Sequence, residues 1–100
     1  TNPRAMLGLG ASLILRQQPD GALPVLARAL ELGAPRGAVA AQKGLALDLL
    51  GQQRDAQIAY AEAIAADPAD RTNPQRMALS LAISGDRAAA LRMMGRFADD

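Results

Sequence analysis

The sequence predicts an all-α protein made of antiparallel helical hairpins, and three observations support this prediction. Ala, Leu, Arg and Gln dominate while β-branched and aromatic residues are few, and this composition favours helix. Apolar residues recur at helical spacing between short segments that carry Gly or Pro. Because every connection between these segments is short, consecutive helices must pair as antiparallel hairpins.

Helix boundaries follow from capping residues and helix breakers. Asn2, Asp20 and Asn73 are expected N-caps, because their side-chain oxygens can accept hydrogen bonds from the first free backbone N–H groups. Gly51 and Gly85 suit the left-handed position that ends many helices. Six helices are therefore predicted, at about residues 3–16, 20–32, 35–50, 54–66, 74–84 and 86–97.

Comparison of the sequence with itself shows a repeat of 34 residues, without gaps, in which Gly10, Gly44 and Ala78 are equivalent. Small residues at this position let the two helices of a hairpin approach closely, and large residues fill the space between hairpins. The second helices supply more small residues at Ala22, Ala56 and Ala90, and the large residues at Leu26, Tyr60 and Met94.

The unit 37–70 resembles a tetratricopeptide repeat (TPR). Its residues at the signature positions of that family are Gly44, Leu47, Gly51, Ala56, Tyr60, Ala63 and Pro68. Units 3–36 and 71–100 match more loosely in the same register. The resemblance implies that residues 1–100 form a single array, a right-handed α-solenoid of three antiparallel hairpins. We also expect the chain to be a piece of a longer protein, because it starts at Thr1 without an initiator Met.

One departure from the repeat bears on a turn. Gln17 stands where the other two units have Gly51 and Gly85. We expect the turn at Gln17 to be more strained or to have a different shape, because only Gly adopts left-handed backbone conformations at little cost.

Composition argues against several classes of function. The net charge is +1 and the charges are scattered, whereas nucleic acid binding and electrostatic docking on a membrane need clustered basic residues. The chain has no Cys and no His, which removes the commonest nucleophiles, general bases and metal ligands. No apolar run is long enough to span a membrane. We therefore predict no catalytic, cofactor or metal site and no membrane insertion of this segment.

Two pairs of carboxylates are candidates for catalytic or ligand-binding chemistry. Asp67 and Asp70 flank Pro68 in a turn, and Asp99 and Asp100 are the last residues. We interpret both pairs as charges at helix ends or in solvent.

The family resemblance implies a binding surface on the first helix of each hairpin, which lines the concave side of the solenoid. This stripe is mostly apolar, and an exposed apolar groove is typical of a site for a protein or peptide. The predicted positions are Arg4, Leu7, Ala11, Ile14, Leu15, Ala38, Ala41, Leu45, Asp48, Leu49, Gln75, Arg76, Leu79, Ala82 and Ile83. An alternative interpretation is that Leu15, Leu49 and Ile83 serve ordinary packing between helices.

One binding mode of the family can be excluded. It clamps a partner's C-terminal carboxylate with Lys and Asn, but Leu7, Ala11 and Gln42 occupy the equivalent positions and only Arg76 fits.

Residues 73–91, NPQRMALSLAISGDRAAAL, are similar to the closing repeat of TadD-type pilus assembly lipoproteins. Residues 44–64, GLALDLLGQQRDAQIAYAEAI, are similar to their penultimate unit. This resemblance implies a pilus or secretin component as partner, and a periplasmic or outer-membrane location through a lipid anchor upstream. From the residues alone the compartment stays open.

Two functions are compatible with these features. The chain is expected to be a non-enzymatic scaffold or adaptor that binds a partner segment in its groove. The alternative is a structural spacer that self-associates through exposed terminal repeats, as a homodimer for example. Its contact residues would be Ala89, Leu91 and Met93, or Met6 and Leu7.

Overall fold

Five α-helices make up most of the computed structural model, which describes residues 2–86, 89 and 92. They are α1 (Pro3–Leu15), α2 (Pro19–Glu31), α3 (Arg36–Leu49), α4 (Gln53–Ala66) and α5 (Thr72–Ile83). No strand occurs in this part of the chain, so the prediction of an all-α protein is confirmed there. The predicted sixth helix falls almost entirely outside the described residues. At its expected start, however, Asp86 Oδ1 accepts a hydrogen bond of 3.1 Å from the Ala89 backbone N–H, as an N-cap does.

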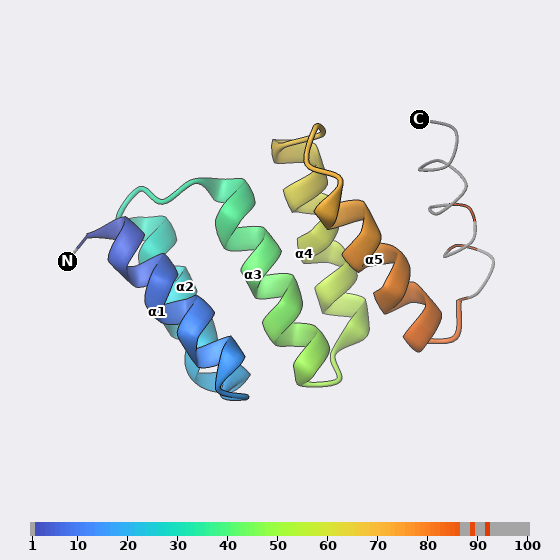
Figure 1. The fold of residues 1–100 in the computed structure, drawn as a ribbon, viewed down its shortest axis with the longest axis horizontal. Coiled ribbons are helices and arrows are strands. Elements are labelled where there is room, and N and C mark those ends of the chain that lie inside the picture. The colour runs from blue at the N-terminus through green and yellow to red at the C-terminus, as the bar shows by residue number, and fades with distance from the viewer. Residues whose placement is uncertain (1, 87–88, 90–91, 93–100) are drawn as a thin grey trace.

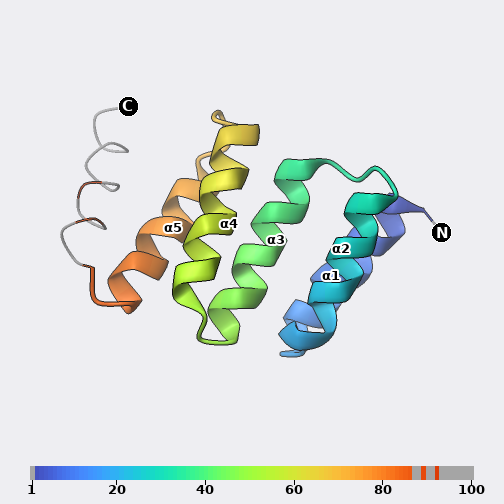
Figure 2. The same cartoon turned by 180° about the vertical axis from the view of Figure 1, so that it is seen from behind.

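The helices lie in two layers, with α1, α3 and α5 in one and α2 and α4 in the other (Figures 1 and 2). The helices α1 and α2 pair closely, as do α3 and α4, and α3 also contacts both α1 and α5. Successive helices run in opposite directions (Figure 1). Antiparallel pairing is therefore observed for the first two predicted hairpins, and the molecule is elongated, with principal dimensions of 42, 26 and 18 Å.

The expected caps hold for one helix and fail for two. Asn2 Oδ1 accepts a hydrogen bond of 2.8 Å from the Arg4 backbone N–H, as predicted. The prediction for Asp20 is wrong because α2 already begins at Pro19, whose fixed φ and missing N–H suit the first helical position.

The prediction for Asn73 is wrong as well. Asp70 Oδ1 accepts a hydrogen bond of 2.9 Å from the Thr72 backbone N–H, and α5 begins at Thr72. Asn73 consequently lies inside the first turn of α5, where it is buried.

The three hairpin turns share one backbone arrangement. Gln17, Gly51 and Gly85 have φ values of +62°, +79° and +93°. Each donates its N–H to the carbonyl three residues earlier, and the next residue donates to the carbonyl five residues before it, which is a Schellman motif. Of the two expectations for Gln17, a strained turn is therefore observed and a different shape is not, because Gln17 occupies the left-handed conformation that its Gly equivalents adopt freely.

The predicted close approach of the helices at Gly10 and Gly44 is observed, but Leu26 and Tyr60, which were expected between hairpins, pack against these glycines within their own hairpins. A Cβ atom built on Gly44 would lie within 2.9 Å of three ring carbons of Tyr60, and one built on Gly10 would lie 2.7 Å from Leu26 Cδ2. Leu26 and Tyr60 are both buried, as are Ala22 and Ala56. The third pair lies partly outside the described residues, because Met94 and Ala90 belong to the segment that is not described.

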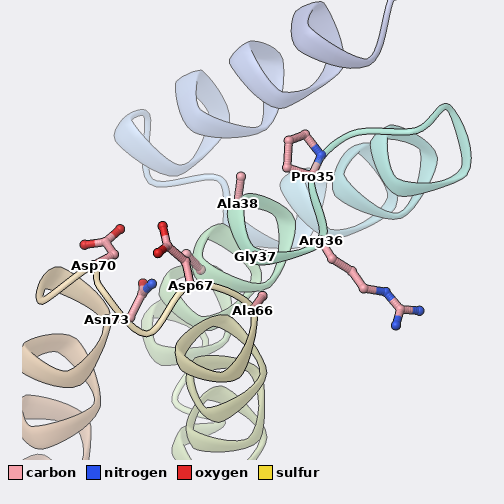
Figure 3. Close-up of a pocket in the computed structure, with 9 residues that line it drawn as sticks. Pro35, Arg36, Gly37, Ala38, Ala66, Asp67, Asp70 and Asn73 are labelled. Atoms are coloured by element: carbon pink, nitrogen blue, oxygen red, sulfur yellow. The ribbon is translucent and has the colours of Figure 1, made fainter.

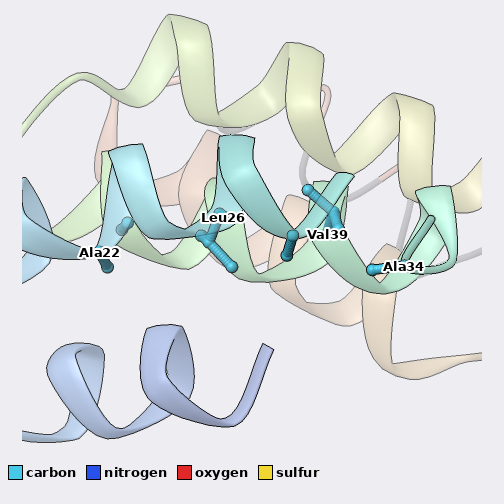
Figure 4. Packing of buried hydrophobic residues seen from close by; sticks show 6 residues of the cluster. Ala22, Leu26, Ala34 and Val39 are labelled. Carbon is cyan, nitrogen blue, oxygen red and sulfur yellow. The ribbon is translucent and has the colours of Figure 1, made fainter. Parts of the chain in front are cut away.

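The core consists of two adjoining clusters. The first gathers side chains from α2, α3 and the connection between them, and Figure 4 shows its packing around Leu26 and Val39. The second surrounds Tyr60, between α3 and α4. Leu23 of α2 packs against both clusters, so the hydrophobic contacts continue from the first hairpin into the second.

Candidate protein-binding surface

The layer formed by α1, α3 and α5 carries an apolar surface that repeats every 34 residues. It consists of two equivalent positions on each helix, four residues apart, so that both side chains lie on the same side of their helix. We name this surface the apolar face, and its residues are Ala11, Leu15, Leu45, Leu49, Leu79 and Ile83.

Large aliphatic side chains on this face are open to solvent. Leu15 is 83% exposed, Leu79 and Ile83 are both 63% exposed, and Leu49 is 48% exposed. Ala11 and Leu45 are half-buried. Leu15, Leu49 and Ile83 therefore do not serve mainly as packing between helices, which was the alternative interpretation of these three residues.

The other predicted residues divide according to their contacts. Leu7 and Ile14 are partly buried and pack against the first core cluster, so their side chains contribute to the core more than to the surface. Surface positions of the same layer include Arg4, Ala38, Gln75 and Ala82, which are exposed, and Ala41 and Arg76, which are half-buried.

Asp48 is already engaged within the molecule. The Tyr60 hydroxyl donates a hydrogen bond of 2.8 Å to Asp48 Oδ2, and the Ser80 hydroxyl donates one of 2.7 Å to Asp48 Oδ1. The carboxylate thus joins α3 to both α4 and α5. Because hydrogen bonds to a charged acceptor are stronger than neutral ones, this arrangement holds the three helices at the apolar face in a defined relation.

The environment of Tyr60 keeps its hydroxyl protonated. Burial raises the pKa of Tyr60 far above its usual value, and the hydrogen bond to Asp48 and the negative charge of that carboxylate raise it further. A neutral Tyr60 remains a donor to Asp48 over the whole physiological range of pH.

Beside the apolar face a cleft of about 480 Å³ opens at the start of α3. It is lined by Ala38 and Ala41 of the predicted surface, and by Asp67, Asp70 and Asn73 from the end of α4 and the start of α5. Figure 3 shows the side chains of these three polar residues gathered on one side of the cleft.

The place of Asn73 in this cleft differs from the prediction, because its position before Pro74 favours an N-cap. A signal was present in the repeat itself. The residue equivalent to Asn73 is Ala5 in the first unit and Val39 in the second unit, and Val39 belongs to the core. A polar residue at a core position of one unit marks a place where packing alone does not explain the choice of side chain.

The described residues offer no group of three or more Asp, Glu, His or Cys that could hold a metal ion. None of the five described helices is both long enough and apolar enough to cross a membrane. A scan against models of protein families found no match to this sequence, and a search of curated proteins found no significant match either.

Proposed function

We propose that this chain is a non-enzymatic scaffold or adaptor that binds a segment of a partner protein on its apolar face. The observation that carries the proposal is the row of exposed leucine and isoleucine side chains repeated on α1, α3 and α5. Large apolar side chains exposed at equivalent positions of one layer are typical of a surface that a protein partner covers.

The geometry of the face favours an extended or helical protein segment over a small molecule. Leu15, Leu49 and Ile83 stand on three neighbouring helices rather than around an enclosed cavity. A segment that crosses the three helices can contact all of them, as amphipathic helices do in hydrophobic grooves. The bonds of Asp48 to Tyr60 and Ser80 support this by holding α3 and α5 in place before binding, which lowers the entropic cost of association.

We also propose that the hairpins are units of a TPR-type right-handed solenoid, in which the apolar face is the concave side. The 34-residue register and the contacts of Gly10 with Leu26 and of Gly44 with Tyr60 support this assignment. Within it, a pilus or secretin component is the partner that the TadD-type resemblance suggests.

The proposal is tested by placing charge on the face and, as a control, on the opposite layer. Leu49→Arg combined with Leu79→Arg adds two charges to the apolar face. Ile58→Arg in α4 is the matched control, because Ile58 is 65% exposed, close to the 63% of Leu79. Each variant would be used as bait for affinity capture from extracts, after circular dichroism has shown that it is folded.

We expect the face variant to lose partners that both the wild type and Ile58→Arg retain. Capture of the same proteins by all three baits would refute the apolar face as the binding surface.

Self-association is the alternative function, and the burial of two of its expected contact residues argues against part of it. Met6 and Leu7 are partly buried and pack against the first core cluster, so they offer a second copy little free surface. Of the other expected contact residues, Ala89 is partly buried, and Leu91 and Met93 lie outside the described residues. Light scattering over a range of concentrations tests the alternative, since a mass that stays monomeric contradicts it.

A further inference from the structure

The cleft beside the apolar face contains a buried polar atom that the fold does not satisfy. Asn73 is 3% exposed, and its Oδ1 atom has no hydrogen-bond partner among the described residues. A buried acceptor without a donor destabilises a fold by about 1–3 kcal/mol, so native proteins rarely retain one without a use for it.

The repeat shows that the fold itself does not require an amide here. The equivalent residue of the preceding unit is Val39, which is 5% exposed and packs in the first core cluster. An aliphatic side chain therefore suits this position of the hairpin. We therefore interpret the amide of Asn73 as a hydrogen-bonding group for a ligand that enters the cleft.

Two carboxylate acceptors lie near Asn73. Asp67 and Asp70 line the same cleft, and neither belongs to the ion pair found among the described residues, which joins Arg28 and Glu31. Hydrogen bonds from Thr72 lower the pKa of Asp70, and the positive charge of Arg76 nearby lowers it further, so the carboxylate is charged at neutral pH.

The helix ends around the cleft differ in the charge that they favour. The C-terminal end of α4, just before Asp67, favours positive charge, whereas the N-terminal ends of α3 and α5, which also line the cleft, favour negative charge, so the case for a cation rests on the carboxylates. Arg36 lines the cleft, but Figure 3 shows its guanidinium pointing away from Asp67, Asp70 and Asn73.

We propose that this cleft accepts the guanidinium group of an arginine side chain from the protein segment that occupies the apolar face, an inference that rests on the proposed function. Guanidinium is planar and carries five N–H donors. It can therefore face two carboxylates and an amide oxygen at once, whereas the ammonium of lysine acts as a compact point charge. Ala38 and Ala41 leave room for the aliphatic part of the arginine, because they are small residues on the wall shared by the cleft and the binding layer.

The test uses the whole chain of 100 residues and a capped arginine, Nα-acetyl-arginine methylamide, as the probe. Binding is followed by the NMR shifts of backbone amides. Nα-acetyl-citrulline methylamide is the matched control, because citrulline has nearly the same shape as arginine but no charge. We expect saturable shifts confined to residues 36–41 and 66–73 with arginine, and none there with citrulline.

Three variants test how much the residues of the cleft contribute to binding of the probe. Asp67→Asn combined with Asp70→Asn removes both charges while leaving an oxygen at position 70 that can still accept from Thr72. We expect it to weaken binding of the probe by about fivefold, the effect of two partly solvated ion pairs. Asp20→Asn, at the start of α2 and outside the cleft, controls for loss of charge and should leave the affinity unchanged.

Asn73→Val is the most informative variant. We expect it to raise the melting temperature, because it removes the unsatisfied amide, and to weaken probe binding at the same time. A purely structural asparagine gives the reverse pattern, with a lower melting temperature and an unchanged affinity. That result, or equal shifts with arginine and citrulline, overturns the inference.

A result that refutes the arginine site in the cleft can be distinguished from a result that refutes the proposed function. The variants Leu49→Arg and Leu79→Arg change no residue that lines the cleft, so partner capture tests the apolar face alone. If the face variant loses its partners but the capped arginine does not bind the wild type, the apolar face is supported as the binding surface and the cleft is refuted as an arginine site.

Discussion

The two described hairpins use the same repeat positions to make different structures. In the hairpin of α1 and α2, Leu26 packs over Gly10 and belongs to the first core cluster. In the hairpin of α3 and α4, Tyr60 packs over Gly44, and its hydroxyl reaches Asp48. Asp48 in turn accepts from Ser80 of α5, so a contact within one hairpin becomes a connection among three helices.

One repeat position can therefore contribute either to apolar packing alone or to a hydrogen-bonded link between helices. A leucine side chain has freedom to move into other rotamers when its neighbour changes. The ring of Tyr60 is fixed at both ends, by Gly44 beneath it and by Asp48 at its hydroxyl. We therefore expect equivalent substitutions in the two hairpins to differ in their cost.

Gly44→Ala should have the largest effect. The added Cβ would lie within 2.9 Å of three ring carbons of Tyr60, and the ring cannot move without losing Asp48. We expect a loss of about 3 kcal/mol in the free energy of unfolding, measured by urea denaturation.

Gly10→Ala is the comparison for that variant. Its Cβ meets the end of Leu26, a flexible side chain, at 2.7 Å. The higher helix propensity of Ala returns about 1 kcal/mol, so the net loss should stay below about 1 kcal/mol. Equal losses in the two variants would contradict the view that Tyr60 is held in place by Asp48.

Asp48→Ala should have the next largest effect. It leaves the buried Tyr60 hydroxyl and the buried Ser80 hydroxyl without their acceptor. We expect a loss of about 2 kcal/mol in unfolding free energy. Hydrogen exchange should also speed up in α5, because the variant removes the bond that joins α5 to α3. Unchanged protection of α5 would show that apolar packing alone positions this helix.

Tyr60→Phe should cost about 1.5 kcal/mol at neutral pH and should change the response to alkali. The pKa of Tyr60 is raised in the folded protein, so its contribution to stability is complete below the pKa of unfolded tyrosine, about 10, and falls as the pH rises beyond it. Tyr60 is the one tyrosine of the chain, so the ultraviolet absorbance of tyrosinate reports on it alone.

We expect that absorbance to appear together with loss of helical circular dichroism in the wild type, and the stability of Tyr60→Phe to vary less between neutral and alkaline pH. Ionisation of Tyr60 near pH 10 with the helices intact would contradict this environment for the hydroxyl.

Gln17→Gly should have the smallest effect, and it should be stabilising. Gln17 has a φ of +62°, whereas the equivalent Gly51 has +79° without strain. Relief of this strain exceeds the greater backbone entropy of unfolded Gly, and we expect a gain of about 0.5–1 kcal/mol. The reverse change, Gly51→Gln, should cost a similar amount. A loss of stability in Gln17→Gly would mean that the side chain of Gln17 contributes to the fold.

Much of the local structure could be predicted because it depends on short-range rules. The boundaries of the five described helices agree with the prediction to within a few residues, and the helices approach closely at Gly10 and Gly44 as expected. Asp20 and Asn73 were misassigned because a proline at the first position and an upstream carboxylate, respectively, start those helices earlier.

The candidate surface was predicted less well. Its exposed members, such as Leu79 and Ile83, lie where the repeat register places them, but Leu7 and Ile14 turned out to contribute to the core. Exposure depends on what a neighbouring helix covers, and a periodic pattern does not contain that information.

Local residue preferences account for the all-helical class, the 34-residue register and the turn positions, because helix propensity, capping and the steric demands of Gly act between residues that are close along the chain. The link from Tyr60 through Asp48 to Ser80, and the burial of Asn73 beside Asp67 and Asp70, arise instead from tertiary packing. These contacts join different helices, and their formation depends on how the helices pack and on which polar atoms the packing removes from water.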